Sequence, residues 1–308
     1  MTHDANLSRK GMPLSGRILL IGMFCATCGT AFAQGQPTPS QQATRIATRA
    51  DDVIVPPKEL DDKVHMAIGL VGNISPTYSG ADEIGKAVAP GARISWKGYS
   101  ISRSAVVRAR STPGNRASET GLAGPLWHIK RFSAGLGISL NRGRDVSEED
   151  RAKGLKSLRG TLIGRLRLRY DLTEHVQFQA RLVGDLLGRQ GGLEVPFGVN
   201  WHHQLTPKLL WTADAGLTWA NGTSMRNTYG IGAPEHAASG LPLYEPGSGI
   251  REYSLSTGLT GEPNARWVWI ARASLVYLTG PAGRSPLVKT RVMPSITVGA
   301  AYRFSFDL

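Results

Sequence analysis

Histidines are the residues of this sequence best suited to acid–base or metal chemistry, and seven are present. His202 and His203 are adjacent in a segment with strand-like alternation, so we predict that they point to opposite faces and cannot share a site or a metal. His175 shares its predicted face with Gln177, which favours a structural hydrogen bond. Motifs for a metal, a serine nucleophile or a phosphate are not found. We therefore expect no catalytic residue, no metal and no cofactor, and a protein that is not an enzyme.

Charged residues at alternate positions form a second group of candidates. If the alternating segments are strands of a barrel, their arginines share the face that points into the barrel. Such a row could line an anion-selective pore. Several carboxylates are predicted to face inward as well, so a network of paired charges that stiffens the barrel is the alternative. Both interpretations stay open. The candidate lumen network comprises Arg165, Arg167, Arg169, Arg181, Asp185, Glu194, Asp214 and Arg272.

A third group of charges lies in and beside the connection Asn141–Leu158. Guanidinium and ammonium groups bind phosphates well, so this loop could contact lipopolysaccharide. Acidic residues at 148–150 in the same loop also allow an ordinary solvated charged loop. The basic residues concerned are Arg142, Arg144, Arg151, Lys153, Lys156 and Arg159.

The N-terminal segment predicts export. Basic residues precede the short apolar run Ile18–Cys25, and a small-residue cleavage site ends at Ala33. We expect residues 1–33 to be a signal peptide, residues 34–63 a flexible periplasmic segment, and residues 64–308 the folded domain. The apolar run is shorter than the roughly 20 residues that a spanning helix needs.

The chain is basic, with 36 Lys+Arg against 23 Asp+Glu and a formal net charge of +13. For an exported protein, the anionic partners within reach are lipid phosphates, lipopolysaccharide and cell-wall polymers, and nucleic acid is not expected. Both cysteines, Cys25 and Cys28, lie in the predicted signal peptide. We therefore expect no disulfide in the mature chain.

The remaining sequence alternates between apolar and polar residues with period two, which is typical of strands. In one segment, Leu166 and Leu168 share a face while Arg165 and Arg167 share the other. Short connections alternate with long ones, as in bacterial barrels with short periplasmic turns and long outer loops. The short ones are Asp171–Glu174, Leu205–Lys208 and Glu262–Ala265, and the long ones are Asn141–Leu158, Ala220–Ile250 and Thr279–Arg291.

We predict an all-β fold, an antiparallel transmembrane β-barrel of the outer membrane with about 12 strands (10–12), and with both termini periplasmic. Termini on one side require an even strand count, which places one less obvious strand at Gly121–Lys130. Trp267 and Tyr277 share one face of a strand, and their separation projects to roughly 25 Å along the membrane normal. That separation fits two aromatic girdles.

Short motifs between Met66 and Phe306 resemble one known family. They include Ser75–Asp82, Gly143-Arg144-Asp145, Lys153-Gly154-Leu155, Thr218-Trp219-Ala220, Tyr229-Gly230-Ile231, Ser239–Gly249, Arg284–Val288 and Tyr302-Arg303-Phe304. Together they resemble the MipA/OmpV family of outer-membrane proteins, which is named for an interaction with a lytic transglycosylase. The motif residues singled out are Pro76, Tyr78, Gly80, Trp219, Tyr229, Gly230, Gly240, Tyr244, Pro246, Ser285 and Pro286.

The resemblance implies a scaffold for periplasmic peptidoglycan-remodelling enzymes, a lytic transglycosylase and a synthase, with a role in envelope maintenance or stress response. Two alternatives remain open: a narrow anion-preferring channel lined by the arginines, and a lipid-modifying barrel enzyme. The loop Asp145–Lys156 and the tail Ser305–Leu308 depart from the family pattern.

Overall fold

In the computed structural model, residues 63–104, 121–141, 153–189 and 191–307 are described, and all belong to one compact unit, Thr38–Leu308. Within these ranges, no helix has both the length and the apolar character needed to cross a membrane. The elements in chain order are β1 (Lys63–Pro76), β2 (Ile84–Trp96), β3 (Tyr99–Ser104), β4 (Gly121–Ile129), β5 (Phe132–Asn141), β6 (Thr161–Asp171), β7 (Val176–Asp185), β8 (Leu193–Thr206), β9 (Leu209–Ala220), α4 (Gly222–Tyr229), α5 (Ala233–Ser239), β10 (Gly249–Gly261), β11 (Trp267–Leu278), α6 (Gly280–Gly283) and β12 (Val292–Asp307).

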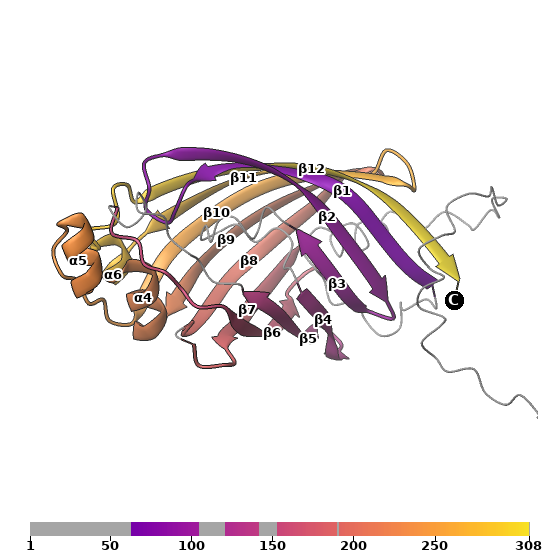
Figure 1. The fold of residues 1–308 in the computed structure, drawn as a ribbon. Coiled ribbons are helices and arrows are strands. Elements are labelled where there is room, and N and C mark those ends of the chain that lie inside the picture. The colour runs from indigo at the N-terminus through magenta and orange to yellow at the C-terminus, as the bar shows by residue number, and fades with distance from the viewer. Residues whose placement is uncertain (1–62, 105–120, 142–152, 190, 308) are drawn as a thin grey trace, which may run out of the picture. The chain divides into compact units, whose positions relative to one another are not determined.

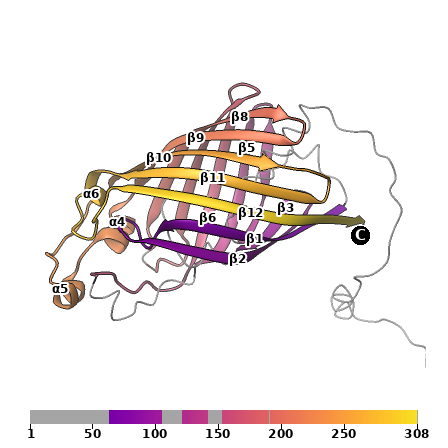
Figure 2. The same cartoon turned by 90° about the horizontal axis from the view of Figure 1, so that it is seen from above.

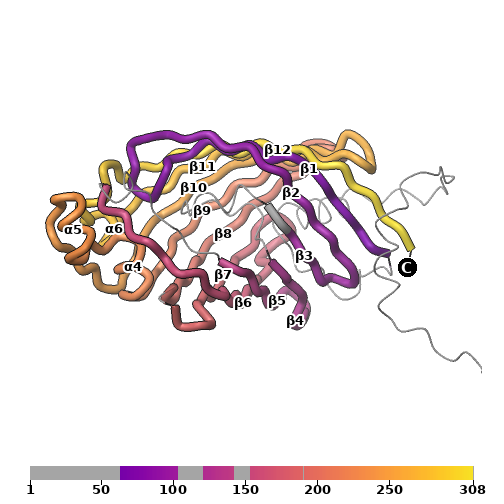
Figure 3. Tube along the Cα trace, viewed as in Figure 1, coloured from indigo at the N-terminus to yellow at the C-terminus, as the bar shows by residue number. Residues whose placement is uncertain are grey.

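The twelve strands of the described residues close into one antiparallel barrel (Figures 1 and 2). Each strand pairs with its neighbours in chain order, and the tube in Figure 3 follows the same path. β1 closes the ring against β12, with a register that runs from Lys63↔Asp307 to Ile74↔Ile296. The predicted fold is confirmed, including the even strand count and a strand that starts at Gly121.

Two predicted strand ends were wrong. The alternation predicts strands at Val64–Gly72 and Val88–Lys97, but β1 continues to Pro76 and β2 begins at Ile84. Polar residues such as Asn73 are buried here on the inward face. Such residues resemble turn residues in a sequence, and for that reason the strands were predicted too short.

The barrel wall is apolar outside and polar inside. On β1 the alternate residues Ile68 and Leu70 are 51% and 60% exposed. Polar residues on the inward face, such as Asn73, Thr212 and Thr218, are buried. A soluble barrel has the reverse arrangement, whereas an outward apolar band suits the hydrocarbon core of a membrane.

The barrel has two different ends. Five short connections of the described chain, residues 97–98, 130–131, 172–175, 207–208 and 262–266, lie at the end where β1 begins and β12 finishes. We call this the turn end. The helices α4, α5 and α6 lie at the opposite end, which we call the loop end (Figure 1). On β11, Trp267 and Tyr277 mark the two ends, and both side chains are exposed, as expected for aromatic girdles.

Candidate functional site

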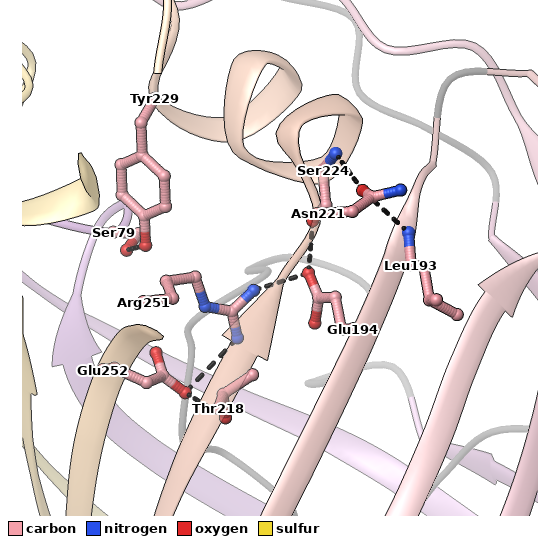
Figure 4. A network of polar contacts seen from close by, with 9 residues as sticks. All are labelled: Ser79, Leu193, Glu194, Thr218, Asn221, Ser224, Tyr229, Arg251 and Glu252. Atoms are coloured by element: carbon pink, nitrogen blue, oxygen red, sulfur yellow. Dashed lines mark hydrogen bonds and ion pairs between the residues drawn. The ribbon is translucent and has the colours of Figure 1, made fainter. Parts of the chain in front are cut away.

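The helix α4 is fixed over the barrel wall by its N-cap residue. Asn221 precedes the helix, and its Oδ1 accepts a hydrogen bond from the backbone N of Ser224 at 2.9 Å. Such a cap satisfies an N–H group that has no partner inside the helix. The same oxygen accepts a hydrogen bond from the backbone N of Leu193 at 3.1 Å. One side chain therefore joins α4 to β8 (Figure 4).

Tyr229, the last residue of α4, joins three connections that are remote in the sequence. Its side chain is 0% exposed, and its hydroxyl lies 2.6 Å from Ser79 Oγ in the β1–β2 connection. Its carbonyl oxygen accepts a hydrogen bond from Ser285 Oγ, in the β11–β12 connection, at 2.6 Å. Burial raises the pKa of the Tyr229 phenol above its ordinary value, so the hydroxyl stays protonated near neutral pH.

The β1–β2 connection comes very close to the β11–β12 connection at Gly80. The backbone there has φ +95°, and a Cβ would lie 2.7 Å from Val288 Cγ2. The carbonyl of Gly80 accepts hydrogen bonds from the N–H groups of Lys289 and Thr290 at 2.8 and 3.1 Å. Only glycine adopts this left-handed conformation without strain and also leaves room for Val288. This gives a physical reason for the glycine in the family motif.

Apolar side chains pack between these connections in two clusters. The first cluster contains Ala220, Met225, Tyr229, Val276, Leu278, Ala282 and Met293, with Val288 against it. The second contains Leu155, Ile231 and Leu287, with Tyr78, Leu241 and Tyr244 against it. Tyr244 also donates a hydrogen bond to the carbonyl of Pro281 at 2.7 Å. We call the packed connections, residues 77–83, 153–156, 221–248 and 279–291, the cap.

Most of the motif residues that carried the family resemblance lie in the cap. Pro76 and Trp219 lie at or next to the ends of strands that lead into it, and Pro76 and Pro246 are fully buried. Gly240 ends α5 in the left-handed conformation, with φ 71°. The motif residues of the cap are Tyr78, Gly80, Tyr229, Gly230, Gly240, Tyr244, Pro246, Ser285 and Pro286.

A buried ion network ties the cap to the barrel wall (Figure 4). Arg251 Nη1 lies 2.5 Å from Glu194 Oε1, and Arg251 Nη2 lies 3.3 Å from Glu252 Oε1. Glu194 Oε1 also accepts a hydrogen bond from Ser224 Oγ of α4 at 2.7 Å, and Glu252 Oε1 accepts one from Thr218 Oγ1 at 3.1 Å. The side chains of Arg251 and Glu252 are 9% and 2% exposed. Losing one partner of such a buried pair is strongly destabilising.

A β-bulge explains how two adjacent residues both face the interior. The register between β10 and β9 shifts between Ile250 and Glu252, so Arg251 is the extra residue. Alternation predicts opposite faces for Arg251 and Glu252, and neither was predicted as a site residue. The sequence signal for them is a charged pair at the start of a strand that is otherwise apolar on one face.

Some residues of the predicted lumen network meet across β10. Asp214 Oδ2 lies 3.5 Å from Arg272 Nη1 and accepts a hydrogen bond from Ser256 Oγ at 2.9 Å. Asp214 Oδ1 accepts a second hydrogen bond from Asn200 Nδ2 at 2.5 Å. Glu194, in contrast, contacts Arg251 of the buried ion network described above.

The four remaining arginines of the predicted network lie on β6 and β7. Arg167 and Arg169 are 7% and 5% exposed, and Arg167 is the register partner of Arg181. Arg165 lies opposite Val183, and all four arginines take part in further interactions. The Asp185 carboxylate accepts hydrogen bonds from the Thr161 hydroxyl and from N–H groups of the β7–β8 connection.

The histidines gather at the turn end more closely than alternation suggests. The ring of His175 lies 6.2 Å from that of His202 and 5.7 Å from that of His203, measured between centroids. Although His202 and His203 are adjacent on β8 and point to opposite faces, both rings therefore lie near the ring of His175. In the described part of the chain, no three potential ligands come together in a way that could hold a metal ion.

The basic connection 141–158 is described only in part. Arg142, Arg144 and Arg151 lie outside the described residues. Lys153 Nζ lies 3.6 Å from Glu83 Oε2 in the cap. Lipopolysaccharide binding by this loop stays a prediction.

The closed antiparallel barrel, with its apolar exterior and polar interior, defines the class of this protein: an outer-membrane β-barrel. A family model described as MltA-interacting protein MipA matches residues 68–304. The chain belongs to this family. No curated protein matches the chain.

Solved structures of similar type are remote from this chain. The CymD monoaromatic hydrocarbon channel is 12% identical, with 91% of this chain and 95% of that chain covered and a TM-score of 0.38. The KdgM porin is 9% identical, with 77% and 99% covered and a TM-score of 0.37. OprD of Pseudomonas aeruginosa is 6% identical, with 82% and 99% covered and a TM-score of 0.33.

Proposed function

We propose that the chain is a non-catalytic scaffold in the outer membrane that docks periplasmic peptidoglycan-remodelling enzymes, and so contributes to envelope maintenance or the stress response. The observation that supports this most is the cap. Fully buried Tyr229 and the Arg251 network hold several connections together across the loop end. Connections packed against one another at the loop end disfavour conduction, and the docking itself would fall to the opposite, periplasmic end. The family description, which names the transglycosylase MltA as a partner, supports this class of enzyme.

Affinity purification of the tagged chain from detergent-solubilised membranes tests the scaffold role. We expect enrichment of a lytic transglycosylase, with or without a peptidoglycan synthase, over an unrelated outer-membrane barrel of similar abundance. If no murein hydrolase or synthase is enriched, the scaffold role is wrong.

A narrow anion-preferring channel is the second candidate. It is favoured by the buried, inward arginines Arg167 and Arg169. In liposome swelling, this candidate requires faster entry of a small anionic solute than of a neutral solute of equal size, and loss of that preference in Arg167→Gln. Equal and negligible swelling with both solutes would remove it.

We further propose that lipid and lipopolysaccharide surround the barrel, that the turn end and both termini face the periplasm, and that a signal peptide is cleaved near Ala33. Residues 1–62 lie outside the described residues, and the only native cysteines are Cys25 and Cys28. Single cysteines at exposed positions can therefore report the orientation. A membrane-impermeant maleimide added to whole cells is expected to label Ala237→Cys in α5 but not Lys208→Cys until the cells are lysed. The reverse pattern would place the loop end in the periplasm.

A further inference from the structure

Cationic side chains dominate the exposed surface of the five turns at the turn end. One carboxylate, Glu174, is exposed in these turns. Five cations are exposed there, and every turn except 172–175 contributes at least one. We call these five the basic ring: Lys97, Lys130, Arg131, Lys208 and Arg266.

Two other carboxylates near this rim have cationic partners. Glu262 Oε1 lies 2.6 Å from Arg303 Nη1, and Asp307 Oδ1 lies 3.3 Å from Lys63 Nζ. Within the described ranges, no carboxylate forms an ion pair with four members of the basic ring: Lys130, Arg131, Lys208 and Arg266.

In the described chain, exposed cations at the loop end are paired with carboxylates more often than at the turn end. Three cations of the cap have acidic neighbours supplied by another part of the cap. The pairs are Lys153–Glu83 at 3.6 Å, Arg226–Glu245 at 3.8 Å and Lys289–Asp82 at 3.5 Å. The cap therefore mixes paired acidic and basic side chains, whereas the five turns expose one carboxylate among five cations.

Two members of the basic ring occupy strained backbone positions. Lys97 and Lys130 have φ 47° and 52°, and among the described residues they are the only non-glycine residues with positive φ. Left-handed backbone costs a side-chain-bearing residue roughly 1–2 kcal/mol, and Gly or Asn usually takes such turn positions. Strain that persists at a charged residue favours a role for that charge.

We propose that the basic ring is the docking surface for an acidic face of a folded periplasmic protein. This assignment rests on the proposed scaffold role and adds the chemistry of the partner's surface. Hairpins follow one another around the rim at about 10 Å intervals, because neighbouring strands lie about 4.8 Å apart. Short turns on a closed barrel hold the cations at fixed positions, which lowers the ordering cost of binding a folded partner. Complementary charge adds specificity and a faster association rate.

The test measures binding of purified MltA to the purified full-length mature chain in detergent. The ring variant combines Lys130→Gln, Arg131→Gln, Lys208→Gln and Arg266→Gln. A matched variant removes four exposed or partly exposed cations of the cap: Lys153→Gln, Arg226→Gln, Arg284→Gln and Lys289→Gln. Heat-modifiable gel migration checks that each variant is a folded barrel.

We expect the ring variant to raise the Kd about tenfold or more at low salt, and the cap variant to leave it within about twofold. The Kd of the wild type is expected to rise steeply between about 0.05 and 0.3 M salt, because exposed charges are screened over this range. A ring variant with wild-type affinity would overturn the docking surface and leave the scaffold role standing. If the wild type itself does not bind MltA, the docking surface is overturned together with MltA as the docked enzyme, and the scaffold role is then decided by the affinity purification.

A lipid surface is the competing use of the same cations. Flotation with phosphatidylglycerol vesicles distinguishes the two. If the ring variant loses vesicle binding but keeps its affinity for MltA, the basic ring contacts lipid and the docking surface is wrong. If affinity for MltA falls whatever the vesicle result, the docking surface is supported.

Discussion

Replacing Arg251 by alanine is expected to lower the free energy of unfolding by about 3–5 kcal/mol. Glu194 and Glu252 would then lose their shared cation, and the side chain of Glu252 is 2% exposed. A buried carboxylate without a counter-charge is costly, and Glu194 also holds α4 through Ser224. Urea unfolding in detergent, followed by tryptophan fluorescence and by the shift between folded and unfolded gel bands, measures the loss.

Two controls separate charge from packing at Arg251. Adding Glu194→Gln and Glu252→Gln to Arg251→Ala removes the uncompensated charges and is expected to recover part of the lost stability. Arg266→Gln, at an exposed turn position, is expected to change stability by less than about 0.5 kcal/mol. If Arg251→Ala unfolds at the same urea concentration as the wild type, the network does not anchor the cap.

Replacing Tyr229 by alanine is expected to destabilise the cap by about 3–5 kcal/mol while the barrel stays folded. The change leaves a cavity in the first apolar cluster and removes the hydroxyl that contacts Ser79. Loosened connections become accessible to proteases, so limited trypsin digestion should cut faster at Arg226 and Lys289. Barrel folding is checked on the same samples by heat-modifiable migration.

Tyr229→Phe is the matched control. It keeps the ring and loses one hydrogen bond, which is worth about 1 kcal/mol, so trypsin cleavage should rise only slightly. Equal cleavage of wild type and Tyr229→Ala would show that the cap does not depend on this side chain.

The barrel could be predicted from the sequence because its wall follows simple alternation. Leu166 and Arg167 fall on opposite faces by strand geometry alone, and the even strand count follows from the position of the termini. Strand ends were harder to place. The end of β1 was missed because Asn73 and Ser75 face a polar interior, where polar residues do not mean a turn.

The cap could be predicted only in part. Family motifs pointed to Tyr78, Tyr229 and Ser285, yet nothing in their spacing shows that three connections meet, because such contacts depend on how the closed barrel brings its rims together. Arg251 was missed for a local reason, since strict alternation places it on the opposite face from Glu252 and the bulge brings both to the interior.

We infer that the packed cap closes the loop end and that the protein acts by binding and not by conduction. Planar-bilayer conductance tests this inference most directly. We predict no steady open level for the wild type and frequent openings for Tyr229→Ala, whose cap is loosened. Stable, anion-selective openings of the wild type that lose their selectivity in Arg167→Gln would contradict this account and establish the channel instead.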